Sequence, residues 1–337
     1  MQVFRGFQHP ALAQPCALTI GNFDGVHRGH QAMLALLKNE AAHRGLPARV
    51  MTFEPHPRAY FSPATAPARI STLRDKLTEL ARCGIDQVVV LPFNARLASH
   101  SPQTFIDDVL VKGLQVRYVL VGDDFRFGSR RAGDYAMLDA AGDARGFEVA
   151  RMNSYEVHGT RVSSSAVRDA LAHGHMEEAA RLLGRPYSIS GHVVHGKKLG
   201  RDLGFRTLNI AFRHDRPAAS GIFAVRTFGL GAAPVDGVAS LGIRPTVEQA
   251  GRVLLEVHCF GWPLAEPGQA GLNSGYGKIV RVELLHKLHD ELKYDGLDAL
   301  KQGIAKDCDD ARAFFGAMAS GASMHTETSR QTTRDRI

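Results

Sequence analysis

The sequence predicts a two-domain protein of class α/β + β, in which a doubly wound parallel-sheet domain precedes a small antiparallel β-domain with a C-terminal helix. Three observations predict this class. The chain has 337 residues, which is too long for one typical domain. Its first half alternates short apolar runs with helical periods. After Gly184, apolar runs follow one another with only Gly, Pro and Asp turns between them.

The first half supplies the elements of the parallel sheet. Its predicted strands are the apolar runs at 17–20, 49–53, 87–91, 118–121 and 147–151. The runs VVVL and YVLV are nearly continuous in Val and Leu, which is typical of parallel strands buried on both faces. The helices predicted between and after these strands begin near Gly29, Thr72, Pro102, Gly133, Ser163 and Met176. This alternation predicts a doubly wound domain over about 1–186.

The second half supplies the antiparallel strands. They are predicted at YSISGHVVHG (187–196), GIFAVRTFG (221–229), DGVASLGI (236–243), RVLLEVHCF (252–260) and KIVRVELLH (278–286). No helical period separates them, so a small barrel or sandwich is expected over 187–318. Leu297, Leu300, Ile304 and Ala305 recur at helical spacing and predict one closing helix. The polar segment 319–337 is expected to be a disordered tail.

Composition excludes several classes of protein. The formal net charge of +7 suits an anionic partner such as a phosphate substrate. The four cysteines are far apart and form no CxxC pair, which predicts neither a zinc site nor a disulfide framework. A signal peptide and an apolar span of membrane length are both missing, so we expect a cytoplasmic protein that binds no membrane. No zinc finger, RNA-binding aromatic motif or homeodomain-like helix set predicts a nucleic-acid partner.

The stretch GNFDGVHRGH (21–30) follows the first predicted strand of the sheet and opens a helix. Ligands of open α/β sheets bind beyond the carboxyl ends of the strands, where VGDDFRFGSRRAGD (121–134) and RVSSSAVR (161–168) also fall. HxGH at a helix start suits nucleotidyl transfer, because backbone N–H groups and imidazoles stabilise charge on phosphate oxygens. The SSSxxR stretch adds hydroxyls and a guanidinium for the β and γ phosphates.

Two other interpretations of these motifs stay open. His27 and His30 stand three residues apart and are also a possible metal pair, although no third ligand follows at a usual spacing. The serines of SSSxxR are residues that often do no more than cap a helix. The combination of FDG, HxGH and SSSxxR favours the nucleotide interpretation.

The stretch GHVVHGKKLGRDLGFRTLN (191–209) predicts a second phosphate site. A Gly-rich hairpin that carries Lys197, Lys198 and Arg201 can wrap a polyphosphate, although a solvated basic turn has the same composition. Thr207 and Asn209 alternate along a predicted strand and therefore lie on one face. Both carry the neutral oxygen ligands that Mg²⁺ accepts.

The chain resembles the family of bacterial bifunctional riboflavin kinase/FAD synthetases. GNFDGVHRGH, TFEPHP (52–57), VGDDFRFGSRRAGD and VSSSAVR are similar, in that order, to its adenylyltransferase module. GRDLGFRTLN, GIFAV, GIRPTV, LEVHCF and YGK are similar to its kinase module, so the resemblance covers roughly residues 17–315. It implies a nucleotidyltransferase domain followed by a riboflavin kinase β-barrel. It also implies that ATP and Mg²⁺ convert riboflavin to FMN, and that ATP then converts FMN to FAD.

The resemblance also implies which residues form the sites. His27 and His30 would act on the ATP phosphates as catalytic residues of the first domain. The expected nucleotide-binding residues are Gly21, Asn22, Phe23, Asp24, Gly29, Ser164, Ser165, Arg168, Gly196, Lys198, Gly200 and Arg201. The expected flavin-binding residues are Asp124, Phe125, Arg126 and Phe127, and the expected magnesium ligands are Thr207 and Asn209.

The kinase module departs from the family pattern at three positions. Arg206 and Leu208 replace a Pro and an Ala of the family's motif, and HDELKY replaces Arg-x-Glu-x-x-Phe, so that His289 stands for the Arg while Glu291 is kept. Because a ribityl hydroxyl keeps its proton at neutral pH, a carboxylate base is useful, and Glu291 is assigned that role.

One alternative function is a nucleotidyltransferase for another phosphorylated substrate, whose second domain only binds flavin. The kept Glu291 argues against it, because a binding module needs no base. As for self-association, either a monomer or a weak oligomer is compatible with the sequence.

Overall fold

The computed structural model describes residues 1–157, 159–195, 204–211, 216–246, 249–262 and 275–334. These residues form two compact units. The first comprises Met1–Val167 and Leu182–Gly184, and the second comprises Arg168–Arg181 and Arg185–Ile337.

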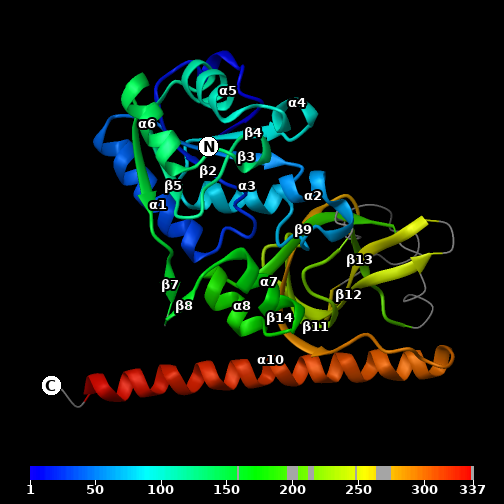
Figure 1. Ribbon diagram of the computed structural model, residues 1–337. Helices are drawn as coiled ribbons and strands as arrows, with labels where there is room; N and C mark the ends of the chain where they lie inside the picture. The colour runs from blue at the N-terminus through cyan, green and yellow to red at the C-terminus, as the bar shows by residue number, and fades with distance from the viewer. Residues whose placement is uncertain (158, 196–203, 212–215, 247–248, 263–274, 335–337) are drawn as a thin grey trace. The chain divides into compact units, whose positions relative to one another are not determined.

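The first unit is built on a six-stranded sheet whose neighbouring strands are all parallel (Figure 1). Its strands are β1 (Gln2–Arg5), β2 (Cys16–Ile20), β3 (Ala48–Glu54), β4 (Gln87–Pro92), β5 (Val116–Gly122) and β6 (Glu148–Met152). The spatial order β1-β4-β3-β2-β5-β6 reverses direction at β2. The carboxyl ends of β2 and β5 therefore form the switch point, which is where such sheets bind ligands.

Helices cover both faces of this sheet. They are α1 (Arg28–His43), α2 (Pro57–Phe61), α3 (Leu73–Arg82), α4 (Ala95–Ala98), α5 (Pro102–Thr104), the π-helical η3 (Phe105–Gly113) and α6 (Tyr135–Arg145). Side chains alternate along each strand, so that Val50 packs against α1 and α3 while its neighbour Met51 packs against η3 and α6. This two-sided burial explains the nearly continuous apolar runs of the sequence.

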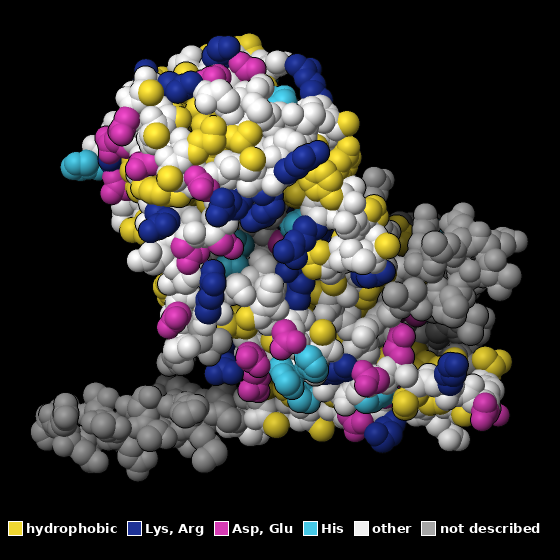
Figure 2. Space-filling model, viewed as in Figure 1, with side chains coloured by type: hydrophobic (Ala, Val, Ile, Leu, Met, Phe, Trp, Pro, Cys, Tyr) yellow, Lys and Arg dark blue, Asp and Glu magenta, His cyan; other side chains and the backbone are white. Residues whose placement is uncertain are grey.

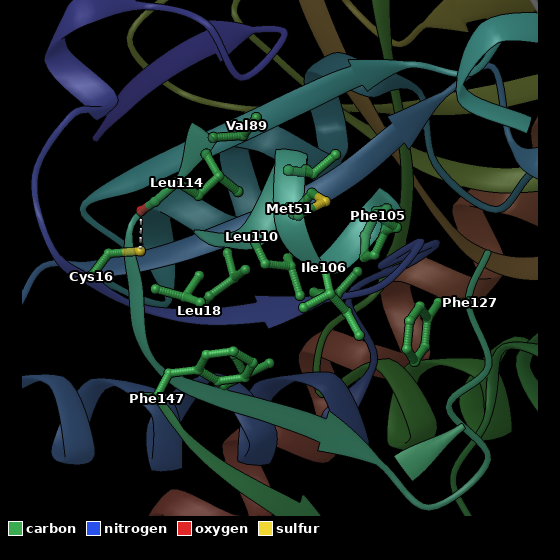
Figure 3. Close-up of a cluster of buried hydrophobic side chains, with 14 of the residues drawn as sticks. Cys16, Leu18, Met51, Val89, Phe105, Ile106, Leu110, Leu114, Phe127 and Phe147 are labelled. Carbon is green, nitrogen blue, oxygen red and sulfur yellow. Dashed lines mark hydrogen bonds between the residues drawn. The ribbon is translucent and has the colours of Figure 1, made fainter. Parts of the chain in front are cut away.

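The core on the η3 side also contains polar groups, each of which has a partner. Figure 3 shows Cys16 beneath Leu110 and Leu114, and its thiol donates a hydrogen bond to the Leu114 carbonyl at 3.3 Å. The fully buried Arg49 donates to Gln87 Oε1 through Nε and Nη2, at 2.9 and 2.7 Å, and to the Leu114 carbonyl through Nη1 at 2.9 Å. Because these acceptors replace water, the cation is accommodated without a carboxylate partner.

The second unit contains a closed antiparallel barrel of order β10-β13-β12-β11-β14-β9. Its strands are β9 (Tyr187–Val194), β10 (Leu208–Ala211), β11 (Gly221–Phe228), β12 (Val235–Thr246), β13 (Gln249–Cys259) and β14 (Ile279–His289). Leu208, Val257 and Ala239 are paired across three of these strands and are buried. Because side chains alternate, the residues between them point away from the barrel interior.

A long helix, α10 (Leu297–Arg334), packs on the outside of this barrel. Ala224 and Val238 of the barrel form a buried cluster with Cys308 and Ala311 of the helix. Leu297, which the helical period placed on the apolar face, is 61% exposed, so the packed face begins further along the helix.

Helix α10 also runs through the segment that was expected to be a disordered tail, because it continues to Arg334. The segment has no proline, and extending an existing helix avoids the cost of nucleation. A polar composition therefore does not by itself end a helix that a packed segment has already started.

The remaining elements are short. They are η1 (Pro10–Leu12), η2 (Pro63–Thr65), η4 (Ser129–Arg131), β7 (Glu156–Val157), β8 (Thr160–Arg161), α7 (Ser164–Ala172) and α8 (Met176–Leu183). The turn between α7 and α8 packs on the barrel, where Gly174 lies against the side chain of Lys287 on β14.

The predicted fold class is confirmed in both units. All five strands predicted for the first half are present, and the second half closes as a barrel rather than a sandwich. Strand β1 was not predicted, because only Phe4 of its four residues is buried and its apolar pattern is too short to detect.

Two glycines of α10 provide a test of this packing. An added Cβ at Gly303 would overlap the ring of Tyr294, whereas one at Gly316 would meet nothing within 4 Å. We therefore expect Gly316→Ala to raise the free energy of unfolding by about 1 kcal/mol, the usual gain in a helix interior. Gly303→Ala should not raise the free energy of unfolding by this amount, because the Tyr294 ring must move to make room for the new Cβ. Urea unfolding followed by circular dichroism measures both, and equal gains would contradict the Tyr294 contact.

Candidate active sites

The loop 21–27 joins β2 to α1 at the switch point of the sheet. Phe23 and Val26 have φ angles of 48° and 41°, so two residues with side chains adopt the left-handed conformation. Such conformations persist only where the surroundings impose them. Both side chains are buried in the core below the loop, with exposed fractions of 1% and 0%, which supplies that constraint. The loop backbone is therefore fixed from beneath.

Asp24 fixes the same loop from the side. Its buried carboxylate accepts hydrogen bonds from Ile70 N (3.2 Å), Ser71 N (3.1 Å) and Ser71 Oγ (3.2 Å), while Ser71 Oγ accepts from Gly25 N (3.0 Å). Asp24 was expected in the nucleotide pocket. In the structure its carboxylate binds the segment before α3, so its contribution to the site is to position the loop.

The histidines of HxGH begin helix α1. His27 caps the helix, because its Nδ1 accepts a hydrogen bond from His30 N at 3.3 Å. The two imidazole rings stack with centroids 3.7 Å apart and planes 16° apart, and His30 also contacts Phe23 at 5.0 Å. The sequence spacing thus places both rings over one face of the helix start. Since the cap occupies His27 Nδ1, that nitrogen has no lone pair left for a metal ion.

The N-terminus of α7 lies beside this helix start. Ser164 Oγ donates to the Asp24 carbonyl at 3.0 Å, and a Cβ added to Gly29 would come within 3.3 Å of the Val162 carbonyl. A side chain at position 29 would therefore make this approach tight. Two helix N-termini, each with unpaired N–H groups and a positive dipole end, converge on one place. Such a place attracts phosphate groups.

The other predicted residues of SSSxxR lie along α7. Ser163 caps the helix through Ala166 N at 3.2 Å, Ser165 is exposed, and Arg168 follows Ser164 by one turn. Ser163 and Ser164 therefore have the capping and tethering roles that a purely structural interpretation predicts. Ser165 is the serine of this stretch whose side chain is exposed at the helix start.

His30 is surrounded by features that keep it neutral. Burial lowers the pKa of His30 well below its usual value, and the charges of His27 and Lys76 lower it further. Its Nδ1 is buried and accepts no hydrogen bond from any described residue. A neutral imidazole can still donate a hydrogen bond to a phosphate oxygen.

Lys76 is a residue of this site that motif reasoning missed. Its buried ammonium donates to Thr52 Oγ1 at 3.3 Å, and Thr52 Oγ1 donates to the Asn22 carbonyl at 3.2 Å. Burial and the nearby Arg69 lower the pKa of Lys76 to about 8. A lysine on the buried face of an otherwise amphipathic helix, α3, was the signal in the sequence.

The predicted flavin-binding stretch follows β5, but its four residues differ in exposure. Asp124 and Arg126 are exposed, and Phe125 is half-buried. Phe127 is a core residue, as Figure 3 shows beside Phe105, and the two rings lie 5.6 Å apart. Phe127 also stacks on Phe125 at 5.5 Å, so it supports the stretch from within and does not face a ligand.

An aromatic cluster at the same edge of the sheet was also missed. Phe53 and Phe93 stand at the ends of β3 and β4, and Phe93 contacts both Tyr60 and Phe61 of α2 at 5.5 and 5.6 Å. Phe61 is 63% exposed, which is unusual for a Phe that belongs to a packed cluster. Exposed aromatic rings held by neighbouring rings suit stacking with a planar ligand.

The second candidate site lies on the outer face of the barrel. Asn209 pairs with Glu256, and Glu256 pairs with Ser240, so these three residues form a row across β10, β13 and β12. Their neighbours along each strand point into the barrel, and the row therefore points outward. Glu291 joins the row, because its Oε1 accepts a hydrogen bond from Ser240 Oγ at 3.0 Å.

Asn209, one of the two magnesium ligands expected from the sequence, stands at one end of the row. Asn209 is only 7% exposed, and its Oδ1 is buried with no hydrogen-bond partner among the described residues. A buried acceptor without a donor suits a cation, and Thr207 stands two residues earlier on the chain. The predicted phosphate-binding residues Gly196, Lys198, Gly200 and Arg201 lie outside the described residues.

Glu256 was not singled out from the sequence, although LEVHCF contains it. The signal was the alternation of this segment, which leaves Glu256 on the face opposite Leu255 and Val257. Directly opposed residues of an antiparallel pair have Cβ atoms about 5 Å apart, so Glu256 adjoins Asn209. Ser240, which Glu291 contacts, is two strands from Asn209, on the order of 10 Å.

The surface of the molecule carries both signs of charge. On the face drawn in Figure 2, Lys and Arg side chains are interspersed with acidic ones. Across the described part of the chain, no group of three or more His, Cys, Asp or Glu side chains has the arrangement of a metal centre. In that same part, each helix is too short or too polar to span a bilayer.

Comparisons with known proteins match each half of the chain to a different family model. Residues 9–166 match the family model of FAD synthetase, and residues 183–315 match that of riboflavin kinase. The bifunctional riboflavin kinase/FMN adenylyltransferase of Escherichia coli K12 is 45% identical over 94% of this chain and 98% of its own length. The Haemophilus influenzae enzyme of the same name is 42% identical over 94% of this chain and 100% of its own length.

A solved structure has a similar fold over nearly the whole chain. It is a crystal structure described as a macrolide-efflux protein from Streptococcus pneumoniae, and it is 26% identical to this chain. The TM-score is 0.72, and the match covers 91% of this chain and 97% of that one.

The protonation of His30 is directly measurable. We expect its ring protons to titrate well below pH 6.5 in an NMR experiment, because burial, the adjacent His27 and the Lys76 cation disfavour the charged form. Lys76→Met should raise that midpoint, because it removes this cation. Lys112→Met is the control, since this lysine pairs with Asp108 at the surface. A midpoint at or above 6.5 in the unmodified protein would contradict the description of His30.

Proposed function

This chain belongs to the family of bifunctional riboflavin kinase/FMN adenylyltransferases, and we propose that each of its two candidate sites performs one of the two reactions. The switch-point site of the first unit transfers the adenylyl group of ATP to FMN. The outer row of the barrel phosphorylates riboflavin. The observation that supports this division is that each unit has its own framework for phosphate: two helix N-termini in one, and the Asn209–Glu256–Ser240 row in the other.

Adenylyl transfer needs charge stabilisation more than a base. A phosphate oxygen of FMN attacks the α-phosphorus of ATP, the bond from that phosphorus to the bridging oxygen breaks, and pyrophosphate leaves. The attacking oxygen is already ionised, so no protein group has to remove a proton. His27 and His30 donate hydrogen bonds to the phosphate oxygens, and the N–H groups at the start of α1 add their dipole. Ser165 and Arg168 bind the departing phosphates.

The FMN ring system requires a flat apolar surface near this site. The aromatic cluster of Phe53, Tyr60, Phe61 and Phe93 supplies such a surface at the carboxyl edge of the sheet. Asp124, Phe125 and Arg126 form the second part of the flavin site after β5, with Phe127 supporting Phe125 from the core. The ring contacts of Phe61 with Tyr60 and Phe93 hold its ring and reduce the entropy lost on stacking.

Riboflavin phosphorylation has different needs, because the attacking group is a neutral hydroxyl. Thr207 and Asn209 hold Mg²⁺, which when bound neutralises charge on the ATP phosphates. A carboxylate removes the hydroxyl proton while the oxygen attacks the γ-phosphorus and ADP leaves.

Two carboxylates on the outer row are candidates for this base. Glu291 was the candidate from the sequence, but its oxygen accepts a hydrogen bond from Ser240, and its side chain is exposed. Glu256 is half-buried and is the direct cross-strand neighbour of Asn209, so it adjoins the site of the ATP phosphates. We therefore propose Glu256 as the base and Glu291 as the group that orients the ribityl chain.

The adenylyl site is tested by separating kcat from KM for FAD formation from FMN. His27→Ala and His30→Ala should each lower kcat by roughly 10²–10³-fold, the usual cost of one group that stabilises transition-state charge. Phe61→Ala should instead raise the KM for FMN several-fold, on the order of the loss of one stacking contact. Riboflavin phosphorylation is the internal control for all three variants. Unchanged FAD formation in a folded His27→Ala variant would contradict the role proposed for His27 in adenylyl transfer.

The kinase base is tested by a matched pair of isosteric variants. Glu256→Gln should lower the kcat of riboflavin phosphorylation by roughly 10²–10⁴-fold, the usual contribution of a general base. Glu291→Gln should lower it less and mainly raise the KM for riboflavin. FAD synthesis from supplied FMN should be normal in both. A larger loss of kcat in Glu291→Gln than in Glu256→Gln would indicate that Glu291 is the base.

A further inference from the structure

His289 ends β14, two residues before Glu291, and both of its ring nitrogens face acceptors. Nε2 lies 2.7 Å from Asp307 Oδ1 on α10, and Nδ1 lies 2.6 Å from the Asp290 carbonyl oxygen. A carboxylate and a carbonyl cannot donate hydrogen bonds. Both contacts are therefore satisfied only when both ring nitrogens carry protons, which is the imidazolium form.

The surroundings of His289 consist of groups of both signs. Asp307 is buried, with 7% exposed, and Lys306 beside it on α10 opposes protonation. The side chain of Asp290 forms an ion pair with Lys287 of β14 at 2.6 Å. Tyr294 interacts with both Asp307 and Lys306. Burial by itself lowers the pKa of His289, but the hydrogen bonds to Asp307 and Asp290 raise it above its ordinary value.

We propose that His289 is a positioning residue of the kinase reaction, which as imidazolium clasps the Glu291 segment to Asp307 of α10. This contact joins two elements, because His289 is the last residue of β14 and Asp307 belongs to α10. It therefore holds the segment that connects them, which contains Glu291. Glu291 follows His289 by two residues, and its carboxylate lies over Ser240 and Gly242 of β12. The inference rests on the proposed role of this face in riboflavin phosphorylation.

The clasp has a definite dependence on pH. Because the pKa of His289 is raised in the folded protein, the clasp is complete below that pKa and is lost as the pH rises through it. Neutral His289 leaves one of its two acceptors without a donor, and the buried Asp307 without its ion pair to the imidazolium. An arginine at this position would remain charged at every working pH. In this chain, riboflavin phosphorylation therefore declines on the alkaline side.

The experiment measures kcat/KM for riboflavin from pH 6 to pH 9 in the full chain, with FAD formation from FMN as the internal control. Wild type should lose roughly tenfold across the titration of His289, the equivalent of one charge-assisted hydrogen bond. His289→Arg should remove this decline, and His289→Gln should be low at every pH. His173→Gln is the matched control, because His173 also faces an aspartate, Asp169, but at the surface.

An NMR titration gives a readout that does not depend on activity. The ring proton signals that disappear in His289→Arg should titrate above pH 6.5 in the wild-type protein. A midpoint at or below 6.5 would overturn the clasp. A raised midpoint with a kinase decline that persists in His289→Arg would overturn its role in positioning. No phosphorylation at any pH would instead overturn the proposed kinase site, while the titration would still decide whether the clasp exists.

Discussion

The buried carboxylate of Asp24 makes the hydrogen bonds on which the proposed adenylyl site depends. It ties the loop after β2 to the segment before α3 through Ile70 and Ser71, and the carbonyl of the same residue receives the hydroxyl of Ser164. A buried charge is stable only when hydrogen bonds replace its water, so the carboxylate imposes one arrangement on its donors. The starts of α1 and α7 consequently meet at one place, with His27 and His30 at its edge.

In the barrel, strand register is what brings the residues of the candidate site together. Its inward residues form the core, and the alternate outward row brings together Asn209, Glu256 and Ser240 from strands that are distant in sequence. Pairing within a sheet is specific, because a slip by one residue would turn the whole row into the core. The Glu291 segment has no strand partner, so its position depends on side-chain contacts such as the pair of His289 with Asp307.

The two reactions explain why the two sites differ in their ionisable groups. An ionised phosphate needs donors, and the first site keeps a neutral His30 among cations, with Lys76 below the loop. A ribityl hydroxyl needs an acceptor for its proton, and the second site presents two carboxylates. Adenylyl transfer, which is favoured by positive surroundings, and riboflavin phosphorylation, which requires a base, are thus proposed to take place at separate sites.

The sequence by itself determined the fold class, most strands of both units and the HxGH and SSSxxR motifs, because apolar periodicity and local spacing encode them. It missed the edge strand β1, whose apolar pattern is too short. It did not reveal Lys76, Glu256 or the aromatic cluster around Phe93, whose roles arise from contacts between segments far apart in the chain. Only the tertiary structure decided that Asp24 and Phe127 face inward, since a motif fixes residue types but not the direction of each side chain. Register and burial, which are properties of the whole fold, made those choices.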